Sequence, residues 1–152
     1  FAGVPADTET RNGGHVVVLY HRPEGEADDA PFAPFPIPLS PKRVADETAE
    51  VKVLLPEHPL LKSPNRAAAE DWESWIQERG LYFPGGYGPE YEELIALSDP
   101  GDDPLRGGIL FARSGKGTYI YTCLALHRQI RTGHAGAARL LANLISPRGL
   151  PR

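Results

Sequence analysis

The apolar positions along the chain form short runs, several of which favour strands. Residues 15–20, His-Val-Val-Val-Leu-Tyr, form a continuous run that follows Gly13 and Gly14. An unbroken β-branched run is typical of a strand buried on both faces, as in a parallel sheet. The polar residues 7–13 before it favour the end of a helix that stops at the glycine pair. A helix followed by a buried strand predicts part of an α/β unit.

Further strands are indicated along the rest of the chain. Residues 50–55 place Val51, Val53 and Leu55 on one side of a short strand. Residues 91–98 fit either a strand or a short helical turn. Residues 108–113 and 118–124 are apolar runs joined by Ser-Gly-Lys-Gly at 114–117, a pattern that favours a β-hairpin.

Two segments show the spacing of amphipathic helices. We predict one helix over residues 68–79 that stops at Gly80, and a second over residues 136–146. Each places its larger side chains on one face: Trp72, Trp75, Ile76 and Arg79 in the first, and Ala137, Leu140, Leu141 and Leu144 in the second.

Residues 22–42 are rich in proline and acidic residues. Proline fixes φ and lacks a backbone donor, so this stretch is neither a helix nor a central strand. We expect a long surface loop, which Phe32, Phe35 and Ile37 anchor on the domain. The alternative is a polyproline ligand for a partner domain.

Composition narrows the class of protein and of partner. The chain has 152 residues, of which 41% are hydrophobic and 24% charged, as expected for a single globular domain. The net charge of -4 argues against nucleic acid as a partner, because a polyanion needs a clustered basic surface. The apolar runs are too short for a membrane span, so we expect a soluble protein of undetermined compartment. Because the chain begins with Phe1 and contains no methionine, we expect it to be a piece of a longer protein.

Motifs for catalysis are incomplete. Residues 114–118 resemble the end of a phosphate-binding loop, but Leu110 and Gly117 stand where that motif needs glycine and a hydroxyl residue. Cys123 follows a predicted strand, where amidotransferase-like enzymes carry their nucleophile. Its neighbours Thr122 and Leu124 are not the glycines that a sharp nucleophile turn uses, so a buried structural cysteine is the favoured interpretation.

The histidines show no metal-binding spacing. His15, His21, His58, His127 and His134 form no local pair of the kind that zinc sites use. A zinc site could still be assembled in three dimensions from His21, His58 and a carboxylate. We therefore expect no metal and no other cofactor in this chain.

The stretch 72–83 is the best candidate for binding. Two tryptophans one helical turn apart beside planar polar side chains could form a carbohydrate platform, because sugars stack on aromatic rings and hydrogen-bond to such groups. Alternatively, the tryptophans are the core stripe of the predicted helix, and an ion pair between Glu78 and Arg79 closes its end. The candidate binding residues are Trp72, Trp75, Gln77, Glu78, Arg79 and Tyr82.

The order of residues from His58 to Ile145 resembles a domain that follows the catalytic domain in some long bacterial members of the LmbE/PIG-L deacetylase-like family. Gly13–His21 also fits that domain. The matching stretches include His58-Pro59-Leu60-Leu61, Asp71-Trp72 with Trp75, Gln77-Glu78-Arg79-Gly80 with Tyr82, Asp99-Pro100-Gly101, Gly115-Lys116-Gly117-Thr118-Tyr119, Arg128-Gln129, and Arg139-Leu140 with Ala142-Asn143.

The resemblance implies a fold and a molecular context. It implies a three-layer α/β fold with a mostly parallel sheet, like that of flavodoxin and of class I glutamine amidotransferases, without the catalytic triad of the latter. Together with the residues above, we expect residues 1–152 to form such a domain or part of one, incomplete at its N-terminus and with a β-hairpin near its C-terminus. The resemblance also implies a neighbouring zinc-dependent N-deacetylase domain that acts on N-acetylated sugars.

Three functions follow as hypotheses. In the leading one, the chain is a non-catalytic accessory domain that packs on the catalytic deacetylase-like domain or frames its groove for an N-acetylated carbohydrate. The alternative is a carbohydrate-binding module that acts alone. The third is an amidotransferase-like enzyme that uses Cys123.

Overall fold

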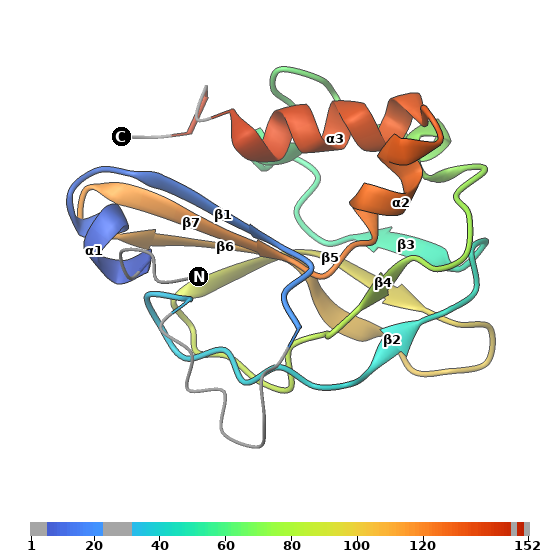
Figure 1. The fold of residues 1–152 in the computed structure, drawn as a ribbon, viewed down its shortest axis with the longest axis horizontal. Helices are drawn as coiled ribbons and strands as arrows, with labels where there is room; N and C mark the ends of the chain where they lie inside the picture. The colour runs from blue at the N-terminus through green and yellow to red at the C-terminus, as the bar shows by residue number, and fades with distance from the viewer. Residues whose placement is uncertain (1–5, 23–31, 147–148, 151–152) are drawn as a thin grey trace.

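The computed structural model describes residues 6–22, 32–146 and 149–150. The strands are β1 His15–Leu19, β2 Arg43–Val44, β3 Glu50–Val53, β4 Gly80–Leu81, β5 Tyr91–Ser98, β6 Leu105–Ser114 and β7 Gly117–Thr122. The helices are α1 Ala6–Arg11, α2 Leu126–Arg131 and α3 Ala135–Ile145, with two 3₁₀ turns, η1 Pro59–Leu61 and η2 Ala69–Trp72. Within these residues, the strands form a five-stranded sheet of order β1-β7-β6-β5-β3 and a two-stranded sheet of β2 and β4 (Figure 1).

The predicted fold class is wrong. In the five-stranded sheet only β1 and β7 pair in parallel, and the other neighbours pair antiparallel. Strands β5, β6 and β7 follow one another through short connections, which impose antiparallel pairing because a parallel pair needs a long crossover. The described residues therefore form a mixed, mostly antiparallel sheet with few helices, and not a three-layer, mostly parallel, flavodoxin-like fold.

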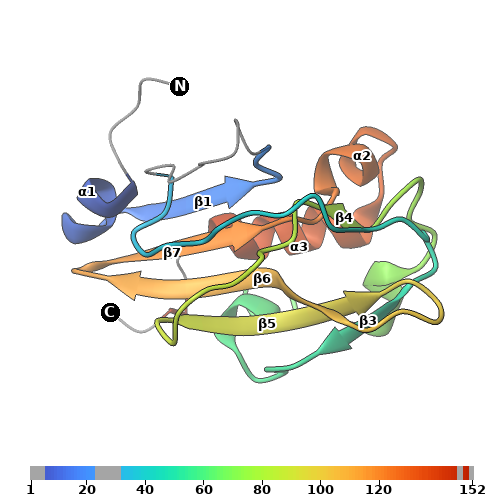
Figure 2. The same cartoon turned by 90° about the horizontal axis from the view of Figure 1, so that it is seen from below.

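The two faces of the large sheet are covered differently. Helices α2 and α3 lie over one face, and residues 32–42 and 82–90 cross the other as irregular chain (Figure 2). The irregular face has an aromatic core, in which the Tyr91 hydroxyl donates to the Phe35 carbonyl at 2.8 Å and the Tyr121 hydroxyl donates to the Tyr82 carbonyl at 2.7 Å. These bonds tie the irregular segments to the strands.

Strand β1 is parallel, as predicted, but it is not buried on both faces. It forms one edge of the sheet and is half-buried, with Leu19 exposed. Its side chains are held by other means. The ring of His15 forms hydrogen bonds with the Thr118 hydroxyl at 2.6 Å and with the Leu144 carbonyl at 2.8 Å, which link the strand to β7 and α3.

The helix predicted over residues 68–79 is also wrong. Only η2 forms there, as a single 3₁₀ turn, and Ser74 and Gln77 have φ angles of 57° and 66°. Left-handed residues cannot belong to a right-handed helix. The apolar spacing arises instead because Trp72, Trp75 and Arg79 pack inward from an irregular segment.

Several local predictions are confirmed. Residues 7–13 contain α1 and the turn after it, residues 50–55 contain β3, and the β6–β7 hairpin turns at residues 115–116. The strand alternative for residues 91–98 is the correct one, and α3 falls within one residue of the predicted helix. Residues 23–31 of the proline-rich stretch lie outside the described residues. In its described part, Phe32 and Phe35 pack on the core and Ile37 is buried, as expected of an anchored loop.

No helix in the described ranges combines the length and apolar character needed to cross a bilayer.

Candidate functional site

A cleft of about 750 Å³ lies between β3 and residues 66–75, which we call the wall segment. This volume is within the range of ligand sites, roughly 300–1,000 Å³. Val51, Val53, Leu61 and Trp72 supply much of its apolar lining. We call this hollow the edge cleft, because β3 is the last strand of the sheet.

Arg79 connects the two sides of the edge cleft. Its Nε donates to the carbonyl of Ala49, the residue before β3, at 3.1 Å, and its Nη1 donates to the carbonyl of Trp72. The guanidinium also lies over the Trp75 ring, 5.4 Å from its centroid, in a cation–π contact. Arg79 is only 5% exposed, and burial lowers its pKa while Asp46 and Glu47 oppose that shift. The buried Arg79 side chain therefore links the two sides of the edge cleft by hydrogen bonds.

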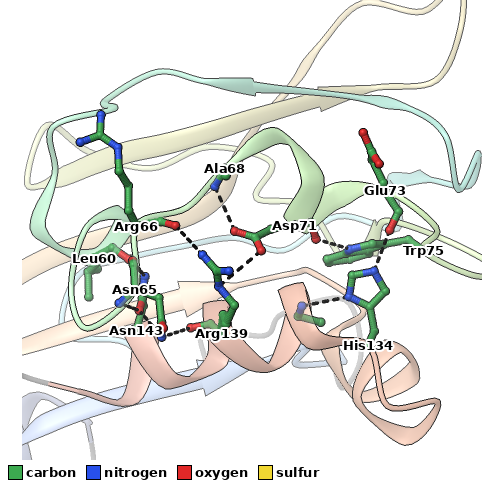
Figure 3. A network of polar contacts seen from close by, with 11 residues as sticks. Leu60, Asn65, Arg66, Ala68, Asp71, Glu73, Trp75, His134, Arg139 and Asn143 are labelled. Carbon is green, nitrogen blue, oxygen red and sulfur yellow. Dashed lines mark hydrogen bonds and ion pairs between the residues drawn. The ribbon is translucent and has the colours of Figure 1, made fainter.

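Asn143 of α3 fixes the start of the wall segment (Figure 3). Its side-chain amide nitrogen donates to the carbonyls of Leu60 and Asn65 at 3.0 and 2.7 Å, and its oxygen accepts from the Asn65 backbone N–H at 2.9 Å. Asn143 is 1% exposed, and its bond to Leu60 is buried, whereas its bonds to Asn65 are partly buried. One buried side chain thus satisfies backbone groups that would otherwise be unpaired.

Arg139 and His134 fix the rest of the wall segment (Figure 3). Arg139 pairs with the Asp71 carboxylate at 3.5 Å, and its Nη2 donates to the Arg66 carbonyl at 2.9 Å. His134 accepts from the Ala137 N–H at the start of α3, so its other ring nitrogen donates to the Glu73 carbonyl at 2.6 Å. The wall of the edge cleft is therefore held in place before any ligand arrives.

His58, which precedes the wall segment in the chain, makes the stability of the fold depend on pH. The ring is buried against Phe111, and its Nδ1 accepts from the Leu60 N–H at 3.2 Å, which requires an unprotonated nitrogen. Burial lowers the pKa of His58; the Glu92 carboxylate opposes this shift, and Arg113 adds to it. Between the pKa of His58 in the folded protein and its unfolded value of about 6.5, the unfolded chain binds more protons than the folded protein does. The contribution of His58 to the free energy of unfolding is therefore complete above pH 6.5 and is lost as the pH falls through the folded pKa.

We expect His58→Asn to flatten the loss of stability below pH 6.5, because asparagine can still cap the turn and does not titrate. The measurement is the free energy of unfolding in urea from pH 7.5 to 5. His127→Asn is the matched control: the pKa of that histidine is also lowered, but its side chain is exposed, so its removal is expected to change the profile less than His58→Asn does. Identical profiles for wild type and His58→Asn would show that His58 does not cause the loss of stability below pH 6.5.

A second group of polar residues lies where β1 and β7 end. We call it the polar cluster; it consists of Tyr20, Gln77, Glu78, Tyr82, His127 and Arg128. The Tyr20 hydroxyl donates to Glu78 Oε1 at 2.8 Å, Arg128 Nε donates to the same oxygen at 3.1 Å, and Arg128 Nη1 donates to Gln77 Oε1. The Glu78 side chain is 11% exposed, whereas the Arg128 side chain is 37% exposed. A nearly buried carboxylate thus anchors a partly open polar surface.

Three residues of the polar cluster have strained backbones. The φ angles of Tyr20, Gln77 and Tyr82 are 50°, 66° and 67°. Such angles are uncommon outside glycine, and when they cluster they often mark functional sites. The rings of Tyr82 and His127 lie 5.6 and 4.7 Å from that of Tyr20. Two aromatic rings therefore pack on Tyr20, whose hydroxyl bonds to the Glu78 carboxylate.

The electrostatics of the polar cluster favour hydrogen bonding over proton transfer. Burial and the Glu78 carboxylate raise the pKa of Tyr20, so its phenol stays protonated at neutral pH. Burial and the charge of Arg128 lower the pKa of His127, which keeps that ring neutral above pH 6.5. Within the described residues, the hydrogen bonds to Glu78 from Tyr20 and Arg128 both engage Oε1.

The structure divides the six candidate binding residues between two places. Trp72, Trp75 and Arg79 face the edge cleft, and both tryptophans are buried, with exposures of 7% and 2%. Gln77, Glu78 and Tyr82 belong instead to the polar cluster. The ion pair considered between Glu78 and Arg79 does not form, because Glu78 pairs with Arg128.

The other candidate chemistry gains no support from the geometry. Cys123 is fully buried, and burial raises its pKa well above that of an exposed thiol, which opposes the thiolate that a nucleophile needs. Residues 114–117 form the hairpin turn. Within the described ranges, no three histidine, cysteine, aspartate or glutamate side chains lie close enough to hold a metal ion. The zinc expected in a neighbouring domain stays a prediction.

The sequence alone does not indicate that Tyr20, His127 and Arg128 join the polar cluster, or that Arg139 and Asn143 support the wall segment. No local pattern indicates them, because their partners are far away in sequence. Asn143 and Asn65 are 78 positions apart, and Arg128 and Glu78 are 50 apart. The one available signal was Tyr20, a polar aromatic residue directly after a β-branched strand.

Comparison of the chain with protein-family models, with curated proteins and with solved structures finds no match.

Proposed function

We propose that this chain is a non-catalytic accessory module of an LmbE/PIG-L-type deacetylase-like protein, in which the polar cluster helps to hold an N-acetylated sugar. The observation that carries the proposal is the polar cluster itself. Glu78, Gln77 and Arg128 offer planar hydrogen-bonding groups beside the rings of Tyr20, Tyr82 and His127, a combination suited to a sugar.

The resemblance described above supplies the deacetylase context. Its implication for the fold is wrong, so we give more weight to the polar cluster than to the family. In this role, the neighbouring zinc-dependent domain performs the hydrolysis, and this chain orients the substrate by contacts to its hydroxyl and acetamide groups. The same cluster would also serve a carbohydrate-binding module that acts alone.

We expect saturable binding when the chain is titrated with N-acetylglucosamine oligomers, followed by two-dimensional NMR. Glu78→Gln is expected to weaken binding roughly tenfold or more, because hydrogen bonds to a charged group contribute about 1.5–3 kcal/mol. Glu90→Gln, at an exposed glutamate outside the polar cluster, is the matched control and should change nothing.

Two outcomes separate the accessory role from the independent one. If the chain frames a groove, then adding a zinc-dependent N-deacetylase domain of this family tightens sugar binding, because the site gains its second wall. An affinity that does not change on this addition supports the module that acts alone. Absence of saturable binding both with and without that domain contradicts both functions.

A further inference from the structure

The backbone of β3 has hydrogen-bonding groups that face away from the sheet. The register pairs Lys52 with Ala96 and Val53 with Ile95, and the Leu54 N–H donates to the Leu94 carbonyl at 2.8 Å. In an antiparallel ladder bonded residues alternate, so Lys52 bonds to β5 whereas Val51 and Val53 point their N–H and C=O groups outward. Within the described residues, no strand pairs with this side of β3.

The edge cleft lies on this outward side. Ala49 is two residues before Val51, so its carbonyl points to the same side of the strand as the carbonyls of Val51 and Val53. Arg79 binds this carbonyl. Arg79 then reaches the Trp72 carbonyl in the wall segment. The wall segment therefore stands across from the free edge of β3, and the space between them can admit an extended chain.

The side chains around the edge cleft define the chemistry of an occupant. Its apolar lining is continuous with exposed Val53 and Leu55, whose exposures are 38% and 37%. Among the residues that line it, exposed Glu47, Glu50 and Glu73 outnumber one exposed cation, Arg66, while exposed Lys52 lies two positions from Glu50 on the same face of β3. Arg79 is buried and bonded to two carbonyls, and its charge interacts with that of Glu47, so the acidic excess at the rim rests on Glu50 and Glu73. The rim thus complements positive charge.

We propose that the edge cleft binds an extended peptide segment of a partner protein, in which apolar and basic side chains alternate, and that this segment adds to β3 as a further strand. The backbone groups of Val51 and Val53 pair with the peptide. Alternate apolar side chains enter the lined hollow, and lysine or arginine side chains meet the glutamates of the rim. This is β-strand addition, in which main-chain bonds supply affinity and alternate pockets supply specificity. The site is separate from the polar cluster and independent of the function proposed above.

The test uses the full chain and blocked hexapeptides of alternating lysine and valine, or of alternating glutamate and valine. We expect saturable binding of the lysine peptide at low salt, with slowed hydrogen exchange at the Val51 and Val53 amides, and no saturable binding of the glutamate peptide. An N-methylated lysine peptide, whose backbone cannot donate hydrogen bonds, should not bind. Higher salt should weaken binding, because the rim charges are exposed.

Two variants locate the site. Glu50→Lys combined with Glu73→Lys should weaken lysine-peptide binding roughly tenfold or more, as two exposed ion pairs of up to about 1 kcal/mol each allow. Glu90→Lys, outside the edge cleft, should have no such effect. Val53→Pro removes an outward N–H and the apolar side chain of Val53, so it is also expected to block binding. The strand itself should persist, because edge strands tolerate proline.

Several outcomes would overturn the proposal. These are absence of saturable binding, binding that leaves the Val51 and Val53 amides unprotected, and binding that survives the charge reversals. Protection of these amides that increases with protein concentration, without peptide, would assign the edge to a second copy of the chain instead.

Discussion

Gly136→Ala is expected to lower the free energy of unfolding by about 2–3 kcal/mol, although alanine is the better helix former. A Cβ at position 136 would lie 2.5 Å from both the Cα and the carbonyl oxygen of Asp71. Both are backbone atoms of the wall segment, and Asp71 is itself held by Arg139. Relief of the clash therefore requires α3 or the wall segment to move, and overpacking of this kind typically costs about 1–3 kcal/mol. Urea unfolding at neutral pH measures the effect.

Gly86→Ala is the matched control for this prediction. A Cβ at Gly86 would meet nothing within 4 Å, and its φ lies outside the left-handed region. The same substitution there is expected to be neutral or slightly stabilising, because alanine restricts the unfolded chain. If Gly136→Ala were as stable as Gly86→Ala, the close approach of α3 to the wall segment would be wrong.

The elements that could be predicted from the sequence are those with local signals. The hairpin of β6 and β7 follows from two apolar runs around Ser-Gly-Lys-Gly, and α3 follows from its 3.6-residue spacing. In both, the backbone hydrogen bonds that define the element join residues close in sequence. The end of α1 at a glycine pair belongs to the same class.

The segment 68–79 could not be predicted in this way. The spacing of Trp72, Trp75 and Arg79 satisfies a helical pattern, but tertiary bonds replace helical ones. Gln129 of α2 accepts from the Ile76 N–H and donates to the Ile76 carbonyl, both at 2.9 Å, and Glu47 accepts from the Gln77 N–H at 2.7 Å. These side chains satisfy backbone groups that a helix would have paired internally. The partners are 30 to 53 positions away, beyond the reach of a local pattern.

The sequence of β1 is one reason why the predicted fold class, with its mostly parallel sheet, is wrong. A β-branched run after a helix end is common in doubly wound folds, and β1 does pair in parallel with β7. However, it pairs with the strand at the end of an antiparallel meander, so one parallel pair does not extend into a parallel sheet. Composition cannot distinguish an edge strand that one neighbour supports from a central strand that two neighbours support.

The position of the candidate binding residues follows from the shape of segment 72–82. The segment passes between the edge cleft and the polar cluster, so successive residues Glu78 and Arg79 face opposite sides. The left-handed φ of Gln77 falls where this change occurs. The sequence pattern singles out this segment as a candidate, but it cannot show that its residues face two different surfaces.

Asn143→Ala is expected to lower the free energy of unfolding by about 3–4 kcal/mol. The substitution leaves the Leu60 and Asn65 carbonyls and the Asn65 N–H without their buried partner, and each unsatisfied buried group costs about 1–3 kcal/mol unless water reaches it. Because these bonds fix the start of the wall segment, hydrogen exchange at residues 60–68 should rise more than exchange in β6.

Asn143→Leu keeps the volume and removes the same bonds, so a comparable loss for that variant assigns the effect to hydrogen bonding and not to a cavity. Asn12→Ala, at an exposed asparagine after α1, is the matched control and should stay within about 0.5 kcal/mol of wild type. A loss at position 143 no larger than that at position 12 would show that α3 does not hold the wall segment through this amide.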